Sequence, residues 1–281
     1  ARTQMEQLSG LDAAFVYLDA RNAPMHVGGL HVYEPGGAAF GFEEFRRHIA
    51  ACIDSSPIFR RRLQQVPLRL GRPFWIDDPH FDLDLHLQHS ALPRPGDWCA
   101  LRDLAARMFS RPLDPERPLW HLTFVSELDS CKRFPRGSFA VISRVHHAAA
   151  DGLGTLDMFN AVWSTAPRRL KRRRSASASR RVAPAPGGLE LLGKSLRGVL
   201  REPGEALGWA AGLVRGGLGA GREFIAREHH APPMLFQAPR SPFNVPISSR
   251  RGFDTATLSL DEIRKIRAAV PGATVNDVVL A

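Results

Sequence analysis

The chain has 281 residues, and 44% of them are hydrophobic, which is enough for a substantial core in one large or two ordinary domains. Its formal net charge is +10, but residues 168–181 alone supply eight basic side chains and no acidic one, so the remainder carries only +2. This distribution excludes a uniformly basic nucleic-acid-binding surface, and no apolar run approaches the ~20 residues that cross a bilayer as a helix.

The cysteine content indicates the cellular compartment. Cys52, Cys99 and Cys131 show no metal-type spacing and are too few for a disulfide framework. The first residues, Ala1–Gly10, lack the basic and then apolar pattern that is typical of a secretion signal. We therefore expect a protein of the reducing cytoplasm.

Two hydrophobic periods alternate along residues 1–130. A spacing of three to four residues between apolar positions predicts amphipathic helices, and alternation of apolar with polar residues predicts strands. The helices are expected at Leu8–Leu18, with Ser9 as N-cap, at Phe42–Ser55 and at Trp98–Phe109. The strands are expected at Met25–Tyr33 and His121–Leu128, with an extended segment over 74–87 that turns at 77–79. We therefore predict an α/β fold of the α+β sandwich kind, a mixed sheet flanked by helices.

Two polar clusters lie inside this pattern. Arg60–Arg62 is predicted to be a solvated turn, with contact to an anionic substrate as the alternative because a strand follows. Asp82, Asp84, His86 and His89 alternate with leucines, as on a half-buried strand with a wet polar face. Such side chains also bind metals, but they form no compact ligand motif here, so we expect no metal site.

The most informative stretch runs over residues 138–152. An apolar, β-branched run ends in the adjacent His146 and His147, and three small residues then lead to an Asp-Gly turn and a helix-like pattern over 153–163. Neighbouring strand residues face opposite sides, so one histidine can enter a cavity while the other packs behind it. A histidine, whose ordinary pKa is about 6.5, suits the removal of a hydroxyl or thiol proton.

Asp151 and Gly152 complete this pattern. Asp151 either hydrogen-bonds the imidazole or anchors the loop through an ion pair with an arginine, and Gly152 permits a backbone angle that other residues resist. Two ordinary histidines at a strand end are the alternative. A second pair, His229–His230, illustrates that alternative, because no strand precedes it and no Asp-Gly follows it. We interpret this second pair as a solvated helix end.

The character of the chain changes at the basic segment. Residues 168–188 cannot bury apolar surface, so we predict a disordered linker. It has two main interpretations, a purely solvated linker and an anchor for anionic lipid head groups. As an anchor, each basic residue near the membrane surface would contribute about 1 kcal/mol of binding free energy. Nucleic-acid binding comes third, because no aromatic residue interleaves the run.

Helical and extended patterns follow the linker. Residues 189–228 are rich in Leu, Ala, Gly and Val at helical spacing, which predicts a helical pair packed on the sheet or, alternatively, a helix at a lipid interface. A proline-rich crossover over 232–246 leads to a predicted strand at Thr255–Leu260 and a helix at Leu260–Val270. Asn276-Asp277 is expected to cap a final helix that begins at Val278.

The pattern His-His-x-x-x-Asp-Gly resembles the active-site motif of the coenzyme A-dependent acyltransferase superfamily, which includes chloramphenicol acetyltransferase. Other stretches resemble bacterial wax ester synthase/diacylglycerol acyltransferases and occur in that family's order. They are Leu8–Phe15, Pro24–Leu30, Pro118–Trp120, Asn244–Ser248 with Arg250 and Arg251, and Thr274–Ala281. The resemblance covers the whole chain and implies a chloramphenicol acetyltransferase-like half.

The resemblance implies a reaction and roles for site residues. An acyl group moves from acyl-CoA, a co-substrate, to a diacylglycerol or fatty alcohol, and no resident cofactor takes part. His147 is implied as the general base, with His146 supporting it from behind. Asn276 and Asp277 are implied to assist the site, Asn276 either as a donor to the oxyanion or only as a helix cap.

The resemblance also bears on the loop and on other functions. Asp151, beside Gly152, is implied to hold the loop by a salt bridge, for which Arg250 and Arg251 are candidate partners. A superfamily acyltransferase acting on another alcohol or amine acceptor is one alternative function. A non-catalytic lipid-droplet or membrane-binding module, carried by residues 168–226, is the other.

The domain organisation implied has three parts. Residues 1–167 form an amino-terminal acyltransferase domain that carries the motif, and 168–188 form the basic linker. Residues 189–281 contain the helical segment, the crossover and the start of a second half that we expect to be truncated. The expected partners are the two substrates, the carboxy-terminal half of the same protein and an anionic membrane or lipid-droplet surface. We expect a cytoplasmic protein that attaches peripherally to that surface. Nucleic acid is not an expected partner.

Overall fold

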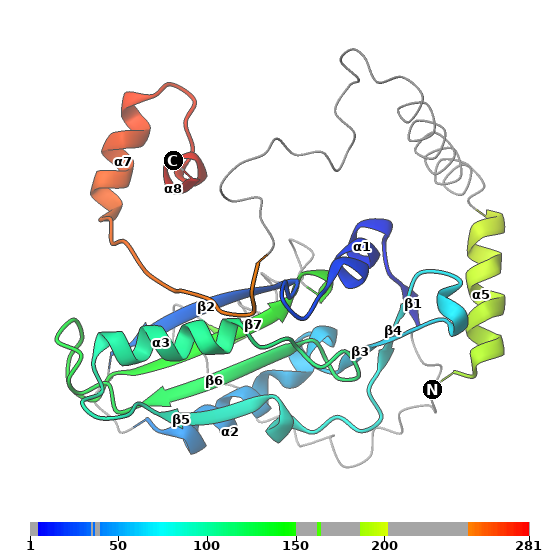
Figure 1. Cartoon of the computed structure of the whole chain (residues 1–281), viewed down its shortest axis with the longest axis horizontal. Coiled ribbons are helices and arrows are strands. Elements are labelled where there is room, and N and C mark those ends of the chain that lie inside the picture. Colours follow the sequence, from blue (N-terminus) through cyan, green and yellow to red (C-terminus); the bar gives the residue numbers. More distant parts are fainter. Residues whose placement is uncertain are drawn as a thin grey trace. The chain divides into compact units, whose positions relative to one another are not determined.

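A computed structural model describes residues 5–34, 36, 40–149, 162–163, 186–201 and 247–280 (Figure 1). The chain divides into two compact units, residues 1–251 and residues 252–281. Most of the predicted linker, the second histidine pair and the proline-rich crossover lie outside the described residues.

Four strands of the described part form the main sheet of the first unit, in the order β2–β7–β6–β5. They are β2 (His26–Tyr33), β7 (Phe139–His146), β6 (Trp120–Ser126) and β5 (Leu87–Ala91). β7 pairs antiparallel with both β2 and β6, whereas β6 and β5 are parallel. The predicted mixed sheet is confirmed, and the strand that carries the histidine pair lies inside it.

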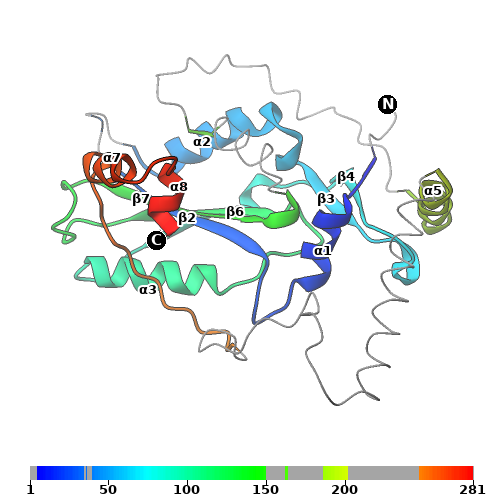
Figure 2. The ribbon, with the colours of Figure 1, turned by 90° about the horizontal axis from the view of Figure 1, so that it is seen from above.

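Helices cover both faces of this sheet, α2 (Phe42–Cys52) on one side and α3 (Trp98–Phe109) on the other (Figure 2). On the α2 side, Phe45 packs against Phe124 of β6 with ring centroids 5.5 Å apart, in the main hydrophobic core. On the α3 side, Gly28 of β2 leaves room for Phe109, because a Cβ at position 28 would lie 2.2 Å from the ring atom Cε1.

The helices predicted in the first 110 residues form where expected. α1 (Gly10–Leu18) begins after Ser9, whose hydroxyl accepts the Asp12 N–H at 3.1 Å, so the predicted N-cap is confirmed. α2 continues as a short 3-10 turn, η1 (Ile53–Ser55), which completes the predicted span. Asp97 caps α3 in the same way by accepting the Ala100 N–H at 2.9 Å.

A second sheet, also within the described residues, has three strands in the order β1–β4–β3. They are β1 (Glu6–Gln7), β4 (Phe74–Asp77) and β3 (Arg61–Gln64). The solvated turn predicted at Arg60–Arg62 is therefore wrong, because Arg61 and Arg62 begin β3 and are only partly exposed. The Arg61 guanidinium pairs with Glu6 at 2.9 Å, so its charge is balanced within the sheet.

The helix α5 (Gly188–Arg201) packs beside this second sheet. Leu191 is buried with Val66 and Ile76, and Ser195 Oγ donates to the carbonyl of Leu70 at 3.2 Å. Short 3-10 turns at Pro57–Phe59 and Pro67–Arg69 complete the connections around β3. None of the helices in the described part of the chain is both long and apolar enough to cross a membrane.

The polar series from Asp82 to His89 is not one strand. Asp82 accepts the Asp84 N–H at 3.0 Å and caps a short 3-10 helix, η4 (Leu83–Leu85). β5 starts only at Leu87, so His86 precedes the strand and is buried rather than on a wet face. A local bond from a side chain to the backbone competes here with strand pairing, and the leucine alternation does not reveal it.

The second unit holds two helices in its described residues, α7 (Leu260–Ala269) and α8 (Val275–Leu280). The predicted helix from Leu260 is confirmed. The predicted strand before it is wrong, because residues 252–259 form no strand. A strand needs a hydrogen-bonded neighbour, and no segment of the described part pairs with these residues. The predicted helix cap is also wrong. Thr274, not Asn276-Asp277, precedes α8, and its hydroxyl accepts the Asp277 N–H at 3.3 Å.

Candidate active site

The histidine pair ends the central strand β7 and begins a 3-10 turn, η5 (His147–Ala149). His146 is only 4% exposed, whereas His147 is partly exposed. The end of the strand therefore separates the two rings in the way that strand geometry predicts: one is packed inside and the other reaches the surface.

His146 is held by its neighbours through both backbone and ring. Its N–H donates to the carbonyl of Leu119 at 3.0 Å, and its Nδ1 accepts the Ala148 N–H at 3.0 Å. Because Nδ1 is an acceptor, the ring proton of neutral His146 lies on Nε2, which is 3.8 Å from Asp19 Oδ2. Burial lowers the pKa of His146, an effect that Asp19 opposes, so the ring is neutral near pH 7. His146 thus fixes the turn that presents His147.

His147 is fixed by its backbone and by one ring face. Its N–H donates to the carbonyl of Met25 at 2.8 Å, and its imidazole stacks on Phe15 of α1 with ring centroids 4.8 Å apart and an interplanar angle of 18°. Within the described residues neither ring nitrogen has a hydrogen-bond partner. A ring held in this way keeps a nitrogen lone pair available to take a proton.

Asp19, the residue that ends α1, connects the elements around the pair. Its Oδ1 accepts the Met25 N–H at 2.8 Å, and its Oδ2 faces His146. Met25 in turn holds the His147 backbone. Asp19 is not recognisable as a site residue from the sequence, where its one signal is its place between the first helix and the first strand of the main sheet.

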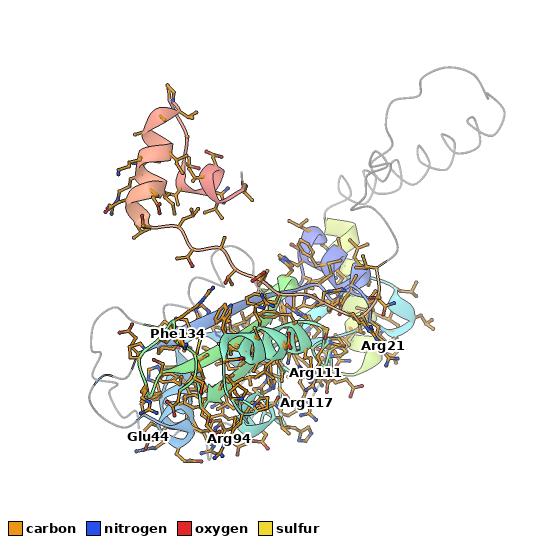
Figure 3. The ribbon with its side chains drawn as sticks, turned by 60° about the vertical axis from the view of Figure 1, so that its left-hand side comes forward. Arg21, Glu44, Arg94, Arg111, Arg117 and Phe134 are labelled. Carbon is orange, nitrogen blue, oxygen red and sulfur yellow. The ribbon has the colours of Figure 1, made fainter. Side chains whose placement is uncertain are left out.

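Further polar groups are buried on the α3 side of the sheet beside His146. His26 lies opposite His146 in the register of β2 and β7, and its Nε2 donates to the carbonyl of Phe109 at 3.1 Å. Burial, reinforced by Arg144, lowers the pKa of His26 to about 4. Burial also lowers the pKa of Arg144, to about 10, and Arg144 Nη1 donates to the carbonyl of Arg111 at 2.6 Å. Arg111, which follows α3, is labelled in Figure 3.

The remaining predicted site residues are placed as follows. Asp151 and Gly152 lie outside the described residues, and with them the predicted ion pair of Asp151. Of its two candidate partners, Arg251 donates from Nη1 to the carbonyl of Ser248 at 2.7 Å and from Nη2 to the carbonyl of Asn22. Arg250 donates its backbone N–H to Ser248 Oγ at 3.2 Å.

Asn276 and Asp277 belong to the second unit. Asp277 Oδ2 accepts the backbone N–H and the hydroxyl of Thr274 at 2.7 and 2.8 Å, and these bonds lower the pKa of Asp277. Asn276 is exposed, and its side chain makes no hydrogen bond in the described part of the chain. Trp120, interpreted on physical grounds as a core residue, is 1% exposed, and its Nε1 donates to the carbonyl of Phe59 at 3.1 Å.

A mixed sheet covered by helices on both faces, with a histidine pair at the end of its central strand, defines the chloramphenicol acetyltransferase-like class of fold. The structure of a wax ester synthase/diacylglycerol acyltransferase from Marinobacter aquaeolei matches 98% of this chain and 58% of that one, with a TM-score of 0.56 and 26% sequence identity.

The family model described as the wax ester synthase/diacylglycerol acyltransferase catalytic domain matches residues 8–279, and the chain belongs to this family. A putative diacylglycerol O-acyltransferase of Mycobacterium tuberculosis is 32% identical over 281 residues, which cover 99% of this chain and 57% of that relative. A probable diacylglycerol O-acyltransferase of the same species is 34% identical over 273 residues, which cover 93% and 95% of the two chains. The resemblance noted in the sequence is thus confirmed, and the chain spans little more than half the length of the first of these relatives.

Proposed function

We propose that this chain carries the base of an O-acyltransferase that moves a long-chain acyl group from acyl-CoA to a diacylglycerol or a fatty alcohol. The observation that carries the proposal is the partly exposed His147 ring, which Phe15 holds on one face and Met25 holds through the backbone. Among the described residues, neither ring nitrogen has a hydrogen-bond partner. Family membership supplies the reaction class, and similar proteins are named diacylglycerol O-acyltransferases.

The transfer has two chemical steps. A neutral His147 nitrogen takes the proton of the acceptor hydroxyl while the oxygen forms a bond to the thioester carbonyl carbon. The resulting tetrahedral oxyanion collapses by breaking the carbon–sulfur bond, and the leaving thiolate of CoA takes the proton from the His147 imidazolium. The histidine returns to its starting state, so the reaction needs no acyl-enzyme and no resident cofactor.

The other predicted site residues have supporting roles in this proposal. Asn276 is a candidate donor to the oxyanion, which needs a donor about 3 Å away. Within the described residues the Asn276 side chain makes no hydrogen bond, whereas the Asp277 carboxylate is bonded to Thr274. Asp151 and Gly152 are assigned to shaping the loop after the histidine pair, and His146 to orienting it.

A transfer assay with matched histidine variants tests the proposal. The protein, supplied with the carboxy-terminal half that is its expected partner, is incubated with palmitoyl-CoA and either dioleoylglycerol or hexadecanol, and released CoA thiol and acylated product are both measured. We expect ester formation that His147→Ala slows by about 10³-fold, while His229→Ala, in the second histidine pair, leaves the rate unchanged. Equal rates for His147→Ala and the parent protein would overturn the assignment of the base.

The acceptor panel separates the two catalytic alternatives. Long-chain alcohols and diacylglycerol are compared with short polar alcohols and amines under the same conditions. Preference for a lipid alcohol supports the proposed substrate class, and preference for a polar alcohol or an amine supports another branch of the superfamily.

Attachment to a lipid surface is a separate part of the proposal. Leu68 and Leu189 are 86% and 87% exposed, on the 3-10 turn at Pro67–Arg69 and on the α5 helix that packs against it. Exposed leucines on adjoining elements are typical of proteins that bind a membrane or a lipid droplet peripherally. Binding to vesicles of anionic phospholipid that Leu68→Ser with Leu189→Ser weakens would support this part. A non-catalytic module would bind vesicles but transfer no acyl group.

A further inference from the structure

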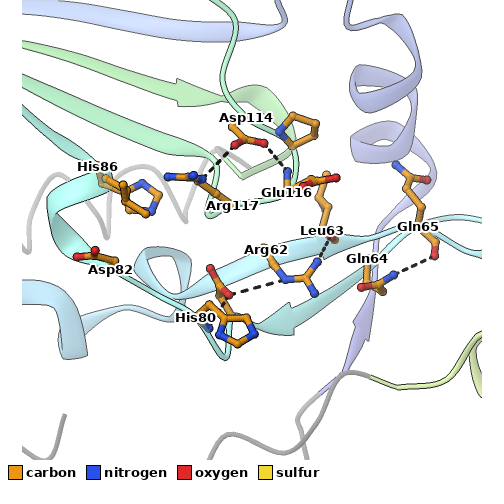
Figure 4. Close-up of a pocket in the computed structure, with 13 residues that line it drawn as sticks. Arg62, Leu63, Gln64, Gln65, His80, Asp82, His86, Asp114, Glu116 and Arg117 are labelled. Atoms are coloured by element: carbon orange, nitrogen blue, oxygen red, sulfur yellow. Dashed lines mark hydrogen bonds and ion pairs between the residues drawn. The ribbon is translucent and has the colours of Figure 1, made fainter. Parts of the chain in front are cut away.

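A cavity of about 760 Å³ lies among strand β3, the segment over 78–86 and the loop over 114–117 (Figure 4). Its volume is in the range of small-molecule sites. His146 and His147 do not line it, so it is separate from the candidate active site. Six of its 13 lining residues carry charged side chains, and the lining includes a buried histidine, His86.

His86 is fixed so that one ring nitrogen is left for this cavity. Its side chain is among the most buried polar groups, at 3% residue exposure, and its Nδ1 donates to the carbonyl of Trp120 at 2.9 Å. The rings of Phe81 and Trp120 stack on it, with centroids 5.5 and 4.6 Å away. The ring proton of neutral His86 therefore lies on Nδ1, and the lone pair of Nε2 has no partner within the described residues.

The charges around the cavity favour a cation. The charged side chains that line it are Asp78, Asp82, Asp114, Glu116, Arg62 and Arg117. Four carboxylates against two guanidinium groups leave a net charge of −2 at neutral pH. Both guanidinium groups are already engaged, Arg117 with Asp114 at 3.0 Å and Arg62 with Asp78 at 3.9 Å. An anionic ligand would have to displace these pairs.

Two carboxylates keep acceptor capacity. The Glu116 side chain has no hydrogen-bond or ion-pair partner in the described part of the chain, and Asp82 accepts only the Asp84 N–H through one oxygen. Together with the open nitrogen of His86, the cavity therefore offers acceptors from two sides. No three His, Cys, Asp or Glu side chains in the described ranges are grouped so that they could hold a metal ion.

We propose that this cavity binds a small organic diamine, with one ammonium group at His86 Nε2 and Asp82 on one side and the other at Glu116 on the opposite side (Figure 4). Each primary ammonium carries three donors and no acceptor, which matches acceptors placed on two sides of the cavity. The Nε2 lone pair of His86 must be free to accept a hydrogen bond. Burial, assisted by Arg117, lowers the pKa of His86 and so favours the neutral ring that has this lone pair. The proposal does not depend on acyl transfer, because it concerns neither His146 nor His147.

Titration calorimetry of the full 281-residue chain with 1,4-diaminobutane and with spermidine, at low salt and pH 7.5, tests the proposal. We expect saturable binding that Glu116→Gln weakens about threefold and His86→Phe about tenfold or more. Phe at position 86 keeps a ring between Phe81 and Trp120 but removes the acceptor nitrogen. Glu43→Gln, an exposed change of the same charge on α2, is the matched control and should leave the affinity unchanged.

Several results would overturn the proposal. The first is the absence of saturable amine binding. The second is equal weakening of binding by Glu116→Gln and Glu43→Gln, which would indicate diffuse attraction to surface charge. The third is displacement of the amine by equimolar Zn²⁺ or phosphate. If circular dichroism shows that His86→Phe does not fold, the comparison of Glu116→Gln with Glu43→Gln decides alone.

Discussion

The end of β7 and the wall of the charged cavity each hold a buried histidine that is tied to the same short stretch of backbone. Leu119 O accepts the backbone N–H of His146, and the next carbonyl, Trp120 O, accepts the ring Nδ1–H of His86. The ring of His146 instead accepts a bond at Nδ1, from Ala148. The two rings are therefore opposite tautomers, although both are buried and neutral.

This difference determines what each histidine can do. His146 keeps its proton on Nε2 and directs it toward Asp19, so it supports the structure and has no free lone pair for chemistry. His86 keeps Nε2 free, as an acceptor for a ligand. His147 is stacked on Phe15, and neither of its ring nitrogens has a hydrogen-bond partner within the described residues. The backbone partner of a histidine, rather than its burial, decides which nitrogen is available.

Removing the open ring of His147 should have the largest effect. His147→Ala is expected to lower the rate of acyl transfer by about 10³-fold, within the range of a general base, because no other nitrogen replaces it. The free energy of unfolding, measured by urea titration, should stay within about 1 kcal/mol of the parent protein's value, since the ring contributes one stacked face. Loss of folding together with activity would show that His147 is structural instead.

Adding a side chain at Gly28, where α3 packs on the sheet, should lower the free energy of unfolding. Gly28→Ala places a Cβ against the Phe109 ring, which must shift, so we expect a loss of about 2–3 kcal/mol in the free energy of unfolding. Gly36→Ala is the matched control, because a Cβ there meets nothing within 4 Å. Equal stability of the two variants in urea titrations would show that α3 does not pack on β2 in this way.

The neutral histidines on the α3 side should make stability depend on pH. The folded pKa values of His26 and His121 are about 4, below their ordinary value, because burial opposes the charged form. As the pH falls from 6.5 toward 4, these histidines take up protons in the unfolded chain before they do so in the folded protein. The stability that the neutral rings contribute is therefore present above pH 6.5 and is lost between pH 6.5 and 4. Because water reaches part of both rings, we expect a loss of about 2 kcal/mol between pH 7.5 and pH 5.

Urea titrations at these two pH values measure that loss. His121→Gln should reduce the difference between them to about half, because it removes one of the two groups. A pH-independent midpoint for the parent protein would contradict the burial of these rings.

The smallest of these effects is expected at Asp19, which acts through its neighbours. Asp19→Asn keeps an acceptor for the Met25 N–H but removes the negative charge beside His146. We expect kcat to fall about tenfold with KM unchanged, because the turn that presents His147 loosens while substrate contacts do not change. The pH profile of kcat should also shift, which a purely structural defect would not produce.

The sequence predicts the features that depend on local pattern. The apolar run before His146 predicts a buried central strand, and Ser9 predicts the start of α1, because each depends only on residues a few positions away. The separation of His146 from His147 also follows from strand geometry alone. The position of the histidine pair at the end of a buried strand is therefore visible in the sequence.

Features that join distant segments are not visible in the same way. Arg61 forms a strand because β4 pairs with it and Glu6 balances its charge, and nothing near Arg61 indicates either partner. Asp19 meets His146 only through the pairing of β2 with β7. Thr274 rather than Asn276 precedes α8, since both residue types favour that position and the pattern does not decide between them.

The proton positions on the histidine rings test the central claim most directly. A long-range proton–nitrogen NMR correlation spectrum at pH 7.5, with signals assigned through His146→Gln and His86→Phe, reports which ring nitrogen carries the proton. We predict a proton on Nε2 of His146 and on Nδ1 of His86. The same tautomer for both rings, or a proton on Nε2 of His86, would contradict it.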